Sequence, residues 1–167
     1  IFLDEPLANL DYKLREELRE QLPELFSGRG TVVVYATSEP EEALLLGGKT
    51  ALMHDGRVTQ FGITADIYRN PVNLTSAEVF SDPPINTAMI EKRGGHAVMQ
   101  GGVKWKLIGA AQGLADGSYR IGIRPSDVLP SKNKQADVKI VGSIKVTELS
   151  GSQSSAHFNF ADQNWVS

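Results

Sequence analysis

Residues 1–11, IFLDEPLANLD, decide how this chain can fold. A short apolar strand delivers two adjacent carboxylates, Asp4 and Glu5, to its carboxyl end, and a third, Asp11, stands where a helix should begin. Open α/β sheets bind ligands at the carboxyl ends of their strands. Near a nucleotide, Mg²⁺ is typically held by one or two carboxylates plus phosphates, and phosphoryl transfer needs a residue that orients the attacking water. Asp4 and Glu5 together offer both functions, although such a pair can also be two solvated acids at a strand end.

The octapeptide DEPLANLD, residues 4–11, resembles the Walker B motif running into the D-loop of ABC transporter ATPases. The resemblance implies ATP and Mg²⁺ as cofactors. It also implies that Asp4 holds Mg²⁺ through water and that Glu5 polarises the attacking water. Asp11 would reach across a homodimer of ATPase subunits and sense the other nucleotide site.

Two other motifs of such ATPases do not occur in the sequence. There is no Gly-x-x-x-x-Gly-Lys-Ser/Thr loop to cradle phosphates, and there is no Leu-Ser-Gly-Gly-Gln signature. The resemblance therefore implies a C-terminal fragment of a longer subunit, and we expect this fragment not to hydrolyse ATP by itself.

Composition predicts an ordinary globular chain with two units. Apolar residues make up 41% and charged residues 22%, and there is no cysteine. No apolar run approaches the roughly 20 residues of a membrane span. Residues 1–84 carry 7 Lys and Arg against 14 Asp and Glu, whereas residues 85–167 carry 10 against 6, which together give the net charge of −3. This asymmetry favours two domains, expected over 1–82 and 83–167. A weakly basic second domain without aromatic-basic clusters argues against nucleic acid as a partner.

The first unit reads as α/β. We expect a strand over 1–4, a helix over 11–26 with Asp11 as its N-cap, and a buried parallel strand over 31–36, where β-branched residues are concentrated. Pro23 should kink the helix or end it early. By resemblance, this strand-helix-strand unit is the C-terminal part of a P-loop NTPase sheet with its helices.

Ser38 occupies a second candidate position. Residues 35–44, YATSEPEEAL, resemble the H-loop region of sugar-importer ATPases, in which a His that reaches the γ-phosphate stands where Ser38 is found. A Ser hydroxyl is shorter and never cationic, so the departure bears on the rate of hydrolysis rather than on nucleotide binding. Alternatively, Ser38 and Glu39 cap the helix that begins near Pro40.

The rest of the first unit reads as a hairpin and two short helices. Asp55-Gly56 is the expected turn of a hairpin over 49–62. Thr64 is the expected cap of a helix over 65–69, and another helix is expected over 73–80. The stretch 60–86 resembles the end of the ATPase domain in maltose-type and glycerol-phosphate-type importers.

The second unit has short segments of strand character separated by glycine turns, which suggests a small barrel or sandwich, and five such strands would make an OB-like barrel. Residues 121–128, IGIRPSDV, resemble a motif of the C-terminal OB-like TOBE regulatory domain in the same importers, and 148–152 resemble a second. Arg124 in the first motif is a candidate for binding an effector anion, or for an internal ion pair at the strand-loop junction.

Three functional hypotheses follow from the resemblance. The first is an ATP-hydrolysing subunit that drives import of sugars, polyols or glycerol phosphates, bound peripherally to permease subunits at the cytoplasmic face of the inner or plasma membrane. The second is a regulatory or dimerisation module whose barrel binds an effector. The third is a regulator that binds ATP but hydrolyses it poorly because Ser38 replaces His.

Overall fold

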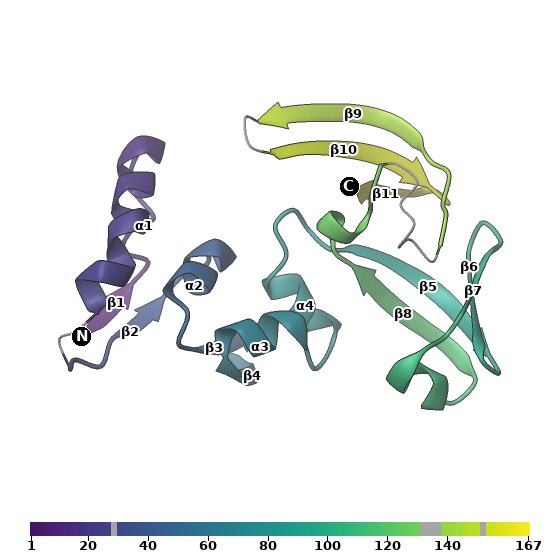
Figure 1. The fold of residues 1–167 in the computed structure, drawn as a ribbon, viewed down its shortest axis with the longest axis horizontal. Helices are drawn as coiled ribbons and strands as arrows, with labels where there is room; N and C mark the ends of the chain where they lie inside the picture. Colours follow the sequence, from purple (N-terminus) through teal and green to yellow (C-terminus); the bar gives the residue numbers. More distant parts are fainter. Residues whose placement is uncertain (28–29, 131–137, 151–152) are drawn as a thin grey trace. The chain divides into compact units, whose positions relative to one another are not determined.

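The computed structural model describes residues 1–27, 30–130, 138–150 and 153–167 (Figure 1). The contacts between Cα atoms divide the chain into two compact units, Ile1–Phe80 and Ser81–Ser167. Each unit has its own hydrophobic core.

The first unit begins with a strand-helix-strand arrangement. Strand β1 (Phe2–Asp4) pairs in parallel with β2 (Val34–Ala36), so that Asp4 lies opposite Ala36. Helix α1 (Tyr12–Phe26) connects them and covers one face of the pair. Asp11 caps this helix as predicted, because its carboxylate accepts a hydrogen bond from the Leu14 N–H at 3.0 Å.

The expectation of a buried strand is wrong for this region. The run at 31–36 is not a buried strand, since β2 has only three residues and Val32 is 79% exposed. Among the described residues, α1 covers only one face of the two strands, and Phe2 and Val34 on the other face are also exposed. Helix α1 continues through Pro23 to Phe26, the end expected for it, so Pro23 does not end it early, and the N–H of Ser27 closes its end on the carbonyl oxygen of Pro23 at 3.1 Å.

The remainder of the first unit packs a hairpin against three short helices. The elements are α2 (Pro40–Leu46), β3 (Lys49–His54), β4 (Arg57–Ile63), α3 (Thr64–Arg69) and α4 (Leu74–Val79). The predicted turn is confirmed: Asp55 and Gly56 both have positive φ, 49° and 71°, as a type I′ turn requires. Leu52, Ile67 and Phe80 form the buried core.

The sequence suggested that Thr64 caps α3, but it does not. It is the first residue of the helix and is 2% exposed. Its hydroxyl lies 2.8 Å from the Thr50 hydroxyl and donates to the carbonyl oxygen of Gly47 at 2.9 Å. The side chain therefore links α3 to the start of the hairpin, a tertiary contact that local sequence could not reveal.

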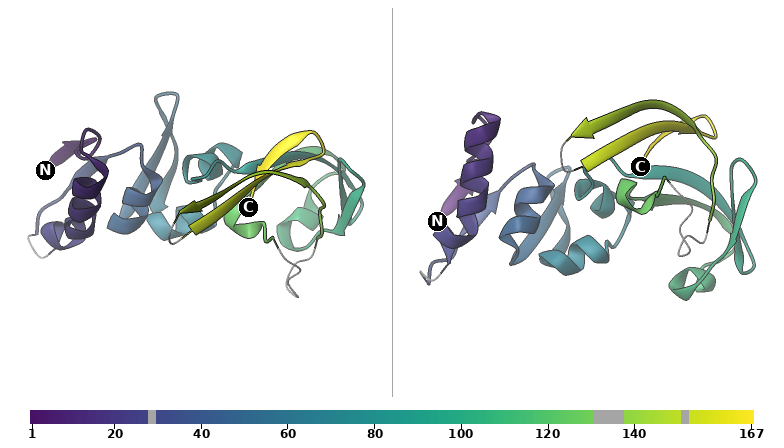
Figure 2. Two further views of the ribbon diagram at one scale, coloured as in Figure 1. Left: turned by 90° about the horizontal axis from the view of Figure 1, so that it is seen from above. Right: turned by 45° about the horizontal axis from the view of Figure 1, so that its top comes forward.

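The second unit consists of two antiparallel sheets (Figure 2). Four strands, in the order β7-β6-β5-β8, form one sheet: β5 (Asn86–Arg93), β6 (His96–Met99), β7 (Val103–Lys106) and β8 (Gly117–Ile123). The other has the order β11-β10-β9: β9 (Ser143–Ser150), β10 (Gln153–Phe160) and β11 (Gln163–Val166). Two short 3₁₀ helices, η1 (Gly109–Gly113) and η2 (Pro125–Asp127), flank β8.

The two sheets share one core and do not close into a barrel within the described residues. Ala97 and Trp165, from different sheets, are 0% and 2% exposed. Asn86 joins the sheets directly: its side-chain amide donates to the carbonyl oxygen of Val166 and accepts from the Val166 N–H, each at 2.7 Å. The mixed helix and strand content expected from the sequence is confirmed, whereas a closed OB-like barrel is not.

Replacing Asn86 tests this link. Asn86→Leu leaves the part-buried Val166 N–H and carbonyl without these partners, and we expect a loss of about 2–4 kcal/mol in the free energy of unfolding. Asn164→Ala on the exposed side of β11 is the control and should change the free energy of unfolding by less than about 0.5 kcal/mol. Urea unfolding followed by tryptophan fluorescence measures both. Equal stability of the two variants would show that Asn86 is not a structural link.

Candidate functional site

The two acids at the end of β1 are held in a tight turn. The Glu5 N–H donates to the carbonyl oxygen of Ala36 at 2.9 Å, which extends the pairing with β2 by one residue. Glu5 then adopts a positive φ of 44°, which is uncommon for a residue with a side chain. Asp4 is exposed and Glu5 is half-buried. Both acids therefore lie at the carboxyl edge of the parallel strands, as predicted.

A short loop separates these acids from Asp11. The Ala8 N–H donates to the Glu5 carbonyl at 3.2 Å, and Leu7 anchors the loop with only 5% exposure. The Arg15 guanidinium supports it from α1 by donating to the Leu10 carbonyl at 3.4 Å. The carboxylate of Asp11 is engaged in capping α1, so it marks the start of the helix rather than joining Asp4 and Glu5.

Ser38 lies in the loop between β2 and α2. Because β2 runs parallel to β1 and Ala36 lies opposite Asp4, the loop leaves the sheet at the same edge as Glu5. Ser38 is exposed, and the N-cap of α2 is Glu39. The Glu39 N–H donates to the Thr37 hydroxyl at 2.9 Å. Helix capping by Ser38, the alternative offered by the sequence, is thus wrong.

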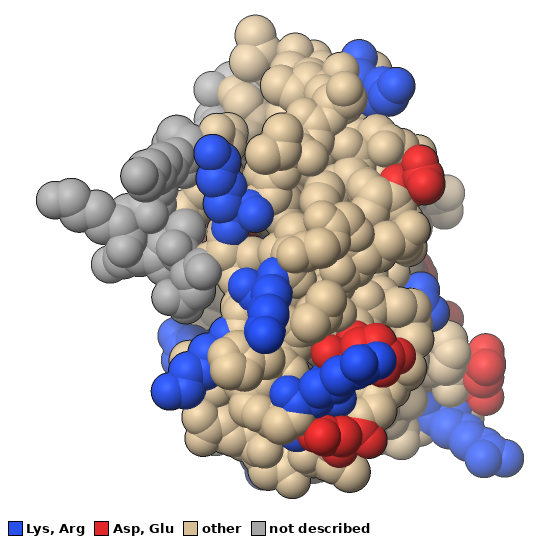
Figure 3. Space-filling model, turned by 90° about the vertical axis from the view of Figure 1, so that its right-hand side faces the viewer, with Lys and Arg blue, Asp and Glu red and all other residues tan. Residues whose placement is uncertain are grey.

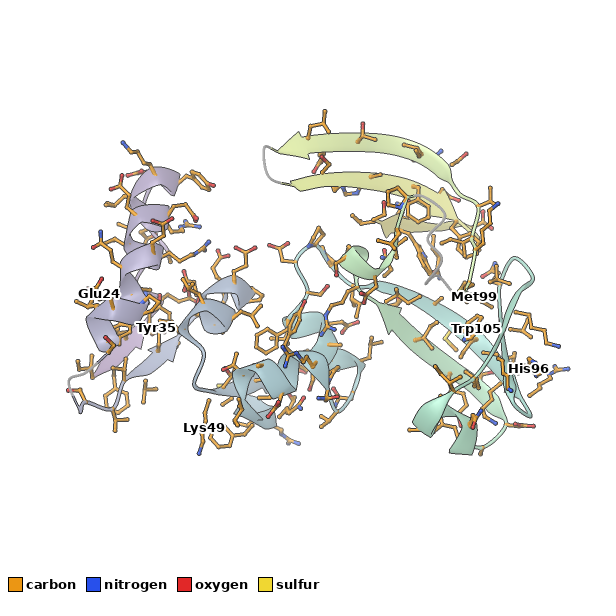
Figure 4. The ribbon with its side chains drawn as sticks, viewed as in Figure 1. Glu24, Tyr35, Lys49, His96, Met99 and Trp105 are labelled. Atoms are coloured by element: carbon orange, nitrogen blue, oxygen red, sulfur yellow. The ribbon has the colours of Figure 1, made fainter. Side chains whose placement is uncertain are left out.

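Behind this edge lies a polar cluster that sequence reasoning missed. Glu42 of α2 is 2% exposed; it accepts a hydrogen bond from the Tyr35 hydroxyl at 3.0 Å, and Arg19 of α1 lies 3.8 Å from it. Arg19 also contacts Glu16 at 2.9 Å and Glu41 at 3.3 Å. Figure 4 shows Tyr35 extending from β2. The cluster joins β2 to α1 and α2, the two helices that follow the candidate loops.

The cluster has a clear electrostatic signature. Burial raises the pKa of Tyr35 above its ordinary range, and the hydrogen bond to Glu42 and the charges of Glu42 and Glu5 raise it further. Tyr35 therefore stays protonated and acts as a donor.

The carboxylates do not assemble a metal site by themselves. Across the described ranges, no group of three or more Asp, Glu or His side chains is positioned to hold a metal ion. Mg²⁺ bound beside a nucleotide takes only one or two carboxylates and completes its shell with water and phosphate oxygens. An exposed Asp4 fits that kind of ligand.

Arg124 belongs to the second unit and to a different local structure. It is half-buried and precedes η2, where its carbonyl accepts a hydrogen bond from the Asp127 N–H at 3.0 Å. The strand-loop junction expected at this motif is therefore present. Whether Arg124 binds an effector stays a prediction.

The second unit also contains a buried cation that the sequence did not single out. Lys92 is 3% exposed, and its ammonium donates to Asp116 Oδ1 and to the Gly94 carbonyl, each at 2.8 Å. Asp116 also accepts from the Gly94 N–H at 2.9 Å. The hydrogen bond from Lys92, and then that from Gly94, hold the pKa of Asp116 below its ordinary value.

Comparison with known proteins places these features in a class. The curated homologues of the chain are ATP-binding subunits of ABC importers for sugars and glycerol phosphate, so the relationship recognised in the sequence motifs is confirmed. A xylose/arabinose import ATP-binding protein of Haloferax volcanii is 32% identical over 162 residues, which cover 96% of this chain and 42% of that protein. An sn-glycerol-3-phosphate import ATP-binding protein of Escherichia coli is 31% identical over 169 residues, which cover 99% of this chain and 47% of that protein. That of Cupriavidus pinatubonensis is 29% identical over 177 residues.

The chain thus spans about half the length of the curated relatives it matches. No family model matches the sequence. Within the part of the chain that the structure describes, no helix is long and apolar enough to cross a membrane.

The polar cluster can be tested by removing its buried carboxylate. Glu42→Ala leaves Arg19 and the Tyr35 hydroxyl without this partner, and we expect unfolding to become easier by about 2–4 kcal/mol. Glu41→Ala is a matched control, since Glu41 contacts the same guanidinium but its side chain is 61% exposed; it should cost less than about 1 kcal/mol. Chemical denaturation measures the free energy of unfolding of both variants. Similar losses of stability in the two would contradict a structural role specific to Glu42.

Proposed function

We propose that the chain is part of an ATP-hydrolysing subunit of an ABC importer for sugars, polyols or glycerol phosphates. The observation that carries the proposal is the edge formed by β1 and β2, where Asp4-Glu5 and the Ser38 loop leave the sheet together. In this function Asp4 holds Mg²⁺ through water, Glu5 polarises the attacking water, and Asp11 senses the second site of a homodimer. The names of the relatives, which import pentoses and glycerol 3-phosphate, support the solute class.

The geometry fits a general base at Glu5 better than at Asp4. Positive φ at Glu5 turns the backbone sharply as it leaves the strand, so the two adjacent side chains are presented from different backbone conformations. Half-burial also shields Glu5 more than the exposed Asp4. A more exposed carboxylate suits a hydrated cation, whereas a shielded one suits the activation of a single water molecule. Asp4 would hold the hydrated Mg²⁺, and Glu5 would orient and deprotonate the attacking water. Mg²⁺ would neutralise phosphate charge.

The remaining parts of the proposal follow the same relationship. The first unit is the end of the ATPase domain, and the second is the OB-like TOBE regulatory domain, whose two sheets share one core. The full-length protein would act peripherally at the cytoplasmic face of the membrane, bound to permease subunits. Without a phosphate-binding loop, the fragment alone would not turn over ATP. Nucleic acid is not a proposed partner, since acidic side chains lie among the scattered basic ones on the face in Figure 3.

The decisive variant is Glu5→Gln in the complete protein with Mg²⁺ present. We expect ATP binding to be retained and ATP turnover to fall by about 10²–10⁴-fold, the usual contribution of general-base catalysis. Glu20→Gln on the exposed side of α1 serves as the control and should turn over ATP normally. Binding is measured with a fluorescent ATP analogue and turnover by phosphate release. Turnover that survives Glu5→Gln would remove Glu5 from the role of base.

A second variant separates a working ATPase from a poorly hydrolysing ATP-binding regulator. Ser38 lies exposed at the same sheet edge and has no capping role, so a longer side chain can be accommodated there. If the missing imidazole limits hydrolysis, Ser38→His should raise turnover by at least about tenfold. Ser38→Gln is the matched control, because it adds length without a titratable ring. No gain with His would mean that the chemistry does not depend on this position.

A further inference from the structure

Helix α1 presents two arginines, Arg15 and Arg19, to the start of α2, the helix beside it in Figure 1. Arg19 contacts acids that lie within α2, so it holds the two helices together. Arg15 instead contacts Glu39, which precedes α2: the guanidinium Nη1 lies 3.6 Å from Glu39 Oε1. Because Glu39 directly follows Ser38, the partner of Arg15 belongs to the Ser38 loop rather than to the helix.

The other terminal nitrogen of the same guanidinium contacts the loop that follows Glu5. Nη2 of Arg15 donates to the carbonyl oxygens of Ala8 and Leu10, at 3.5 and 3.4 Å. The N–H of Ala8 in turn donates to the carbonyl oxygen of Glu5 at 3.2 Å. One planar group on α1 therefore contacts both the loop that begins at Glu5 and the loop that contains Ser38.

The carboxylate of Glu39 is available for this contact. Glu39 is the N-cap residue of α2, but its side chain makes no capping hydrogen bond. The side chains of Arg15 and Glu39 are 27% and 43% exposed, and ion pairs that water reaches stabilise a fold little. A guanidinium has nitrogens that donate in different fixed directions, which the single ammonium of a lysine cannot reproduce. The geometry thus favours a role in holding two loops over a role in stability.

We propose that Arg15 is a positioning residue that couples the two loops of the candidate site. Glu39 orients the guanidinium, and the guanidinium holds the two loop carbonyls, which fixes the turn at Glu5 relative to the Ser38 loop. The coupling of the loops is independent of ATP turnover, whereas the role of Arg15 in hydrolysis rests on the proposed function. Separate measurements address the two parts.

Amide hydrogen exchange tests the coupling in the complete protein without nucleotide. The N–H groups of Ala8 and Leu10 form hydrogen bonds within the loop, at 3.2 and 3.3 Å, and their exchange is followed by NMR. Glu39→Gln removes the charge that orients Arg15, so both amides should exchange about threefold faster, the size of one partly exposed ion pair. Arg15→Gln removes the donors themselves and should accelerate both by about tenfold.

The controls separate a local effect from general destabilisation. Glu17→Gln is the matched charge removal, since Glu17 forms an exposed ion pair with Lys13 within α1, at 3.9 Å. It should leave the exchange of the loop amides unchanged. The N–H of Val34, which donates to the carbonyl oxygen of Ile1 between β1 and β2, is the reference and should exchange equally in all variants.

ATP turnover tests the role in hydrolysis. Arg15→Lys keeps the charge but cannot contact both loops, so kcat should fall by about tenfold with KM for ATP unchanged, as expected when catalytic groups are misplaced and binding is intact. Glu39→Gln should lower kcat by about threefold in the parent and no further in Arg15→Gln, because Glu39 acts through Arg15. Two independent losses of stability would instead add in the double variant.

Three outcomes would contradict the proposal or its basis. Unchanged exchange of Ala8 and Leu10 in Glu39→Gln would overturn the coupling, whatever the turnover. Faster exchange with an unchanged kcat in Arg15→Lys would overturn the role in hydrolysis. A parent protein that binds ATP without turning it over would refute the proposed function, and the exchange data would then decide the coupling by themselves. If Arg15→Gln does not fold, exchange in Glu39→Gln and kcat in Arg15→Lys decide.

Discussion

The parallel pairing of β1 with β2 is the constraint on which the candidate site depends. Parallel strands must both point the same way, so the chain needs a crossover between them, and α1 supplies it. The consequence is that two loops far apart in sequence, one carrying Asp4-Glu5 and the other Ser38, leave the sheet at one edge. An antiparallel arrangement would have sent them to opposite ends. The chemistry proposed for this edge therefore begins with strand direction rather than with any single side chain.

The Arg19–Glu42–Tyr35 cluster gives that edge a fixed support. A buried carboxylate costs free energy unless charges and donors surround it, and Glu42 has both, from Arg19 and from the Tyr35 hydroxyl. Such a cluster stabilises little compared with an apolar replacement, but loss of one member is expensive. The helices that follow the two loops are therefore held in one arrangement, and a shift of α2 would leave Glu42 buried without partners. Positioning, more than stability, is what the cluster provides.

Local chemistry was predictable from the sequence, and tertiary contacts were not. Asp11 as a helix cap and Asp55-Gly56 as a turn follow from rules that act over two to four residues, and both are present. Thr64 looked like a cap by the same rules, but its hydroxyl is used by residues 14 to 17 positions away. The position of Asp4 and Glu5 at a strand end was predictable because strand and loop are contiguous. The support from Tyr35 was not, because an aromatic residue in an apolar run gives no sign that its hydroxyl meets a buried acid.

The indole Nε1–H of Trp165 has no acceptor among the described residues because of how the second unit is held together. The two open sheets are joined by Asn86, whose side-chain amide makes the two backbone hydrogen bonds that a neighbouring strand would otherwise make to Val166. That pairing fixes the backbone of β11 directly beside Trp165. The rings of Phe158 and Phe160, with centroids 6.3 and 5.5 Å from that of the indole, pack against it from β10. The indole therefore cannot turn to reach an acceptor without giving up aromatic packing or the link between the sheets. Both are worth more than one hydrogen bond between neutral groups, so the fold keeps the packing and leaves the buried N–H without an acceptor among the described residues.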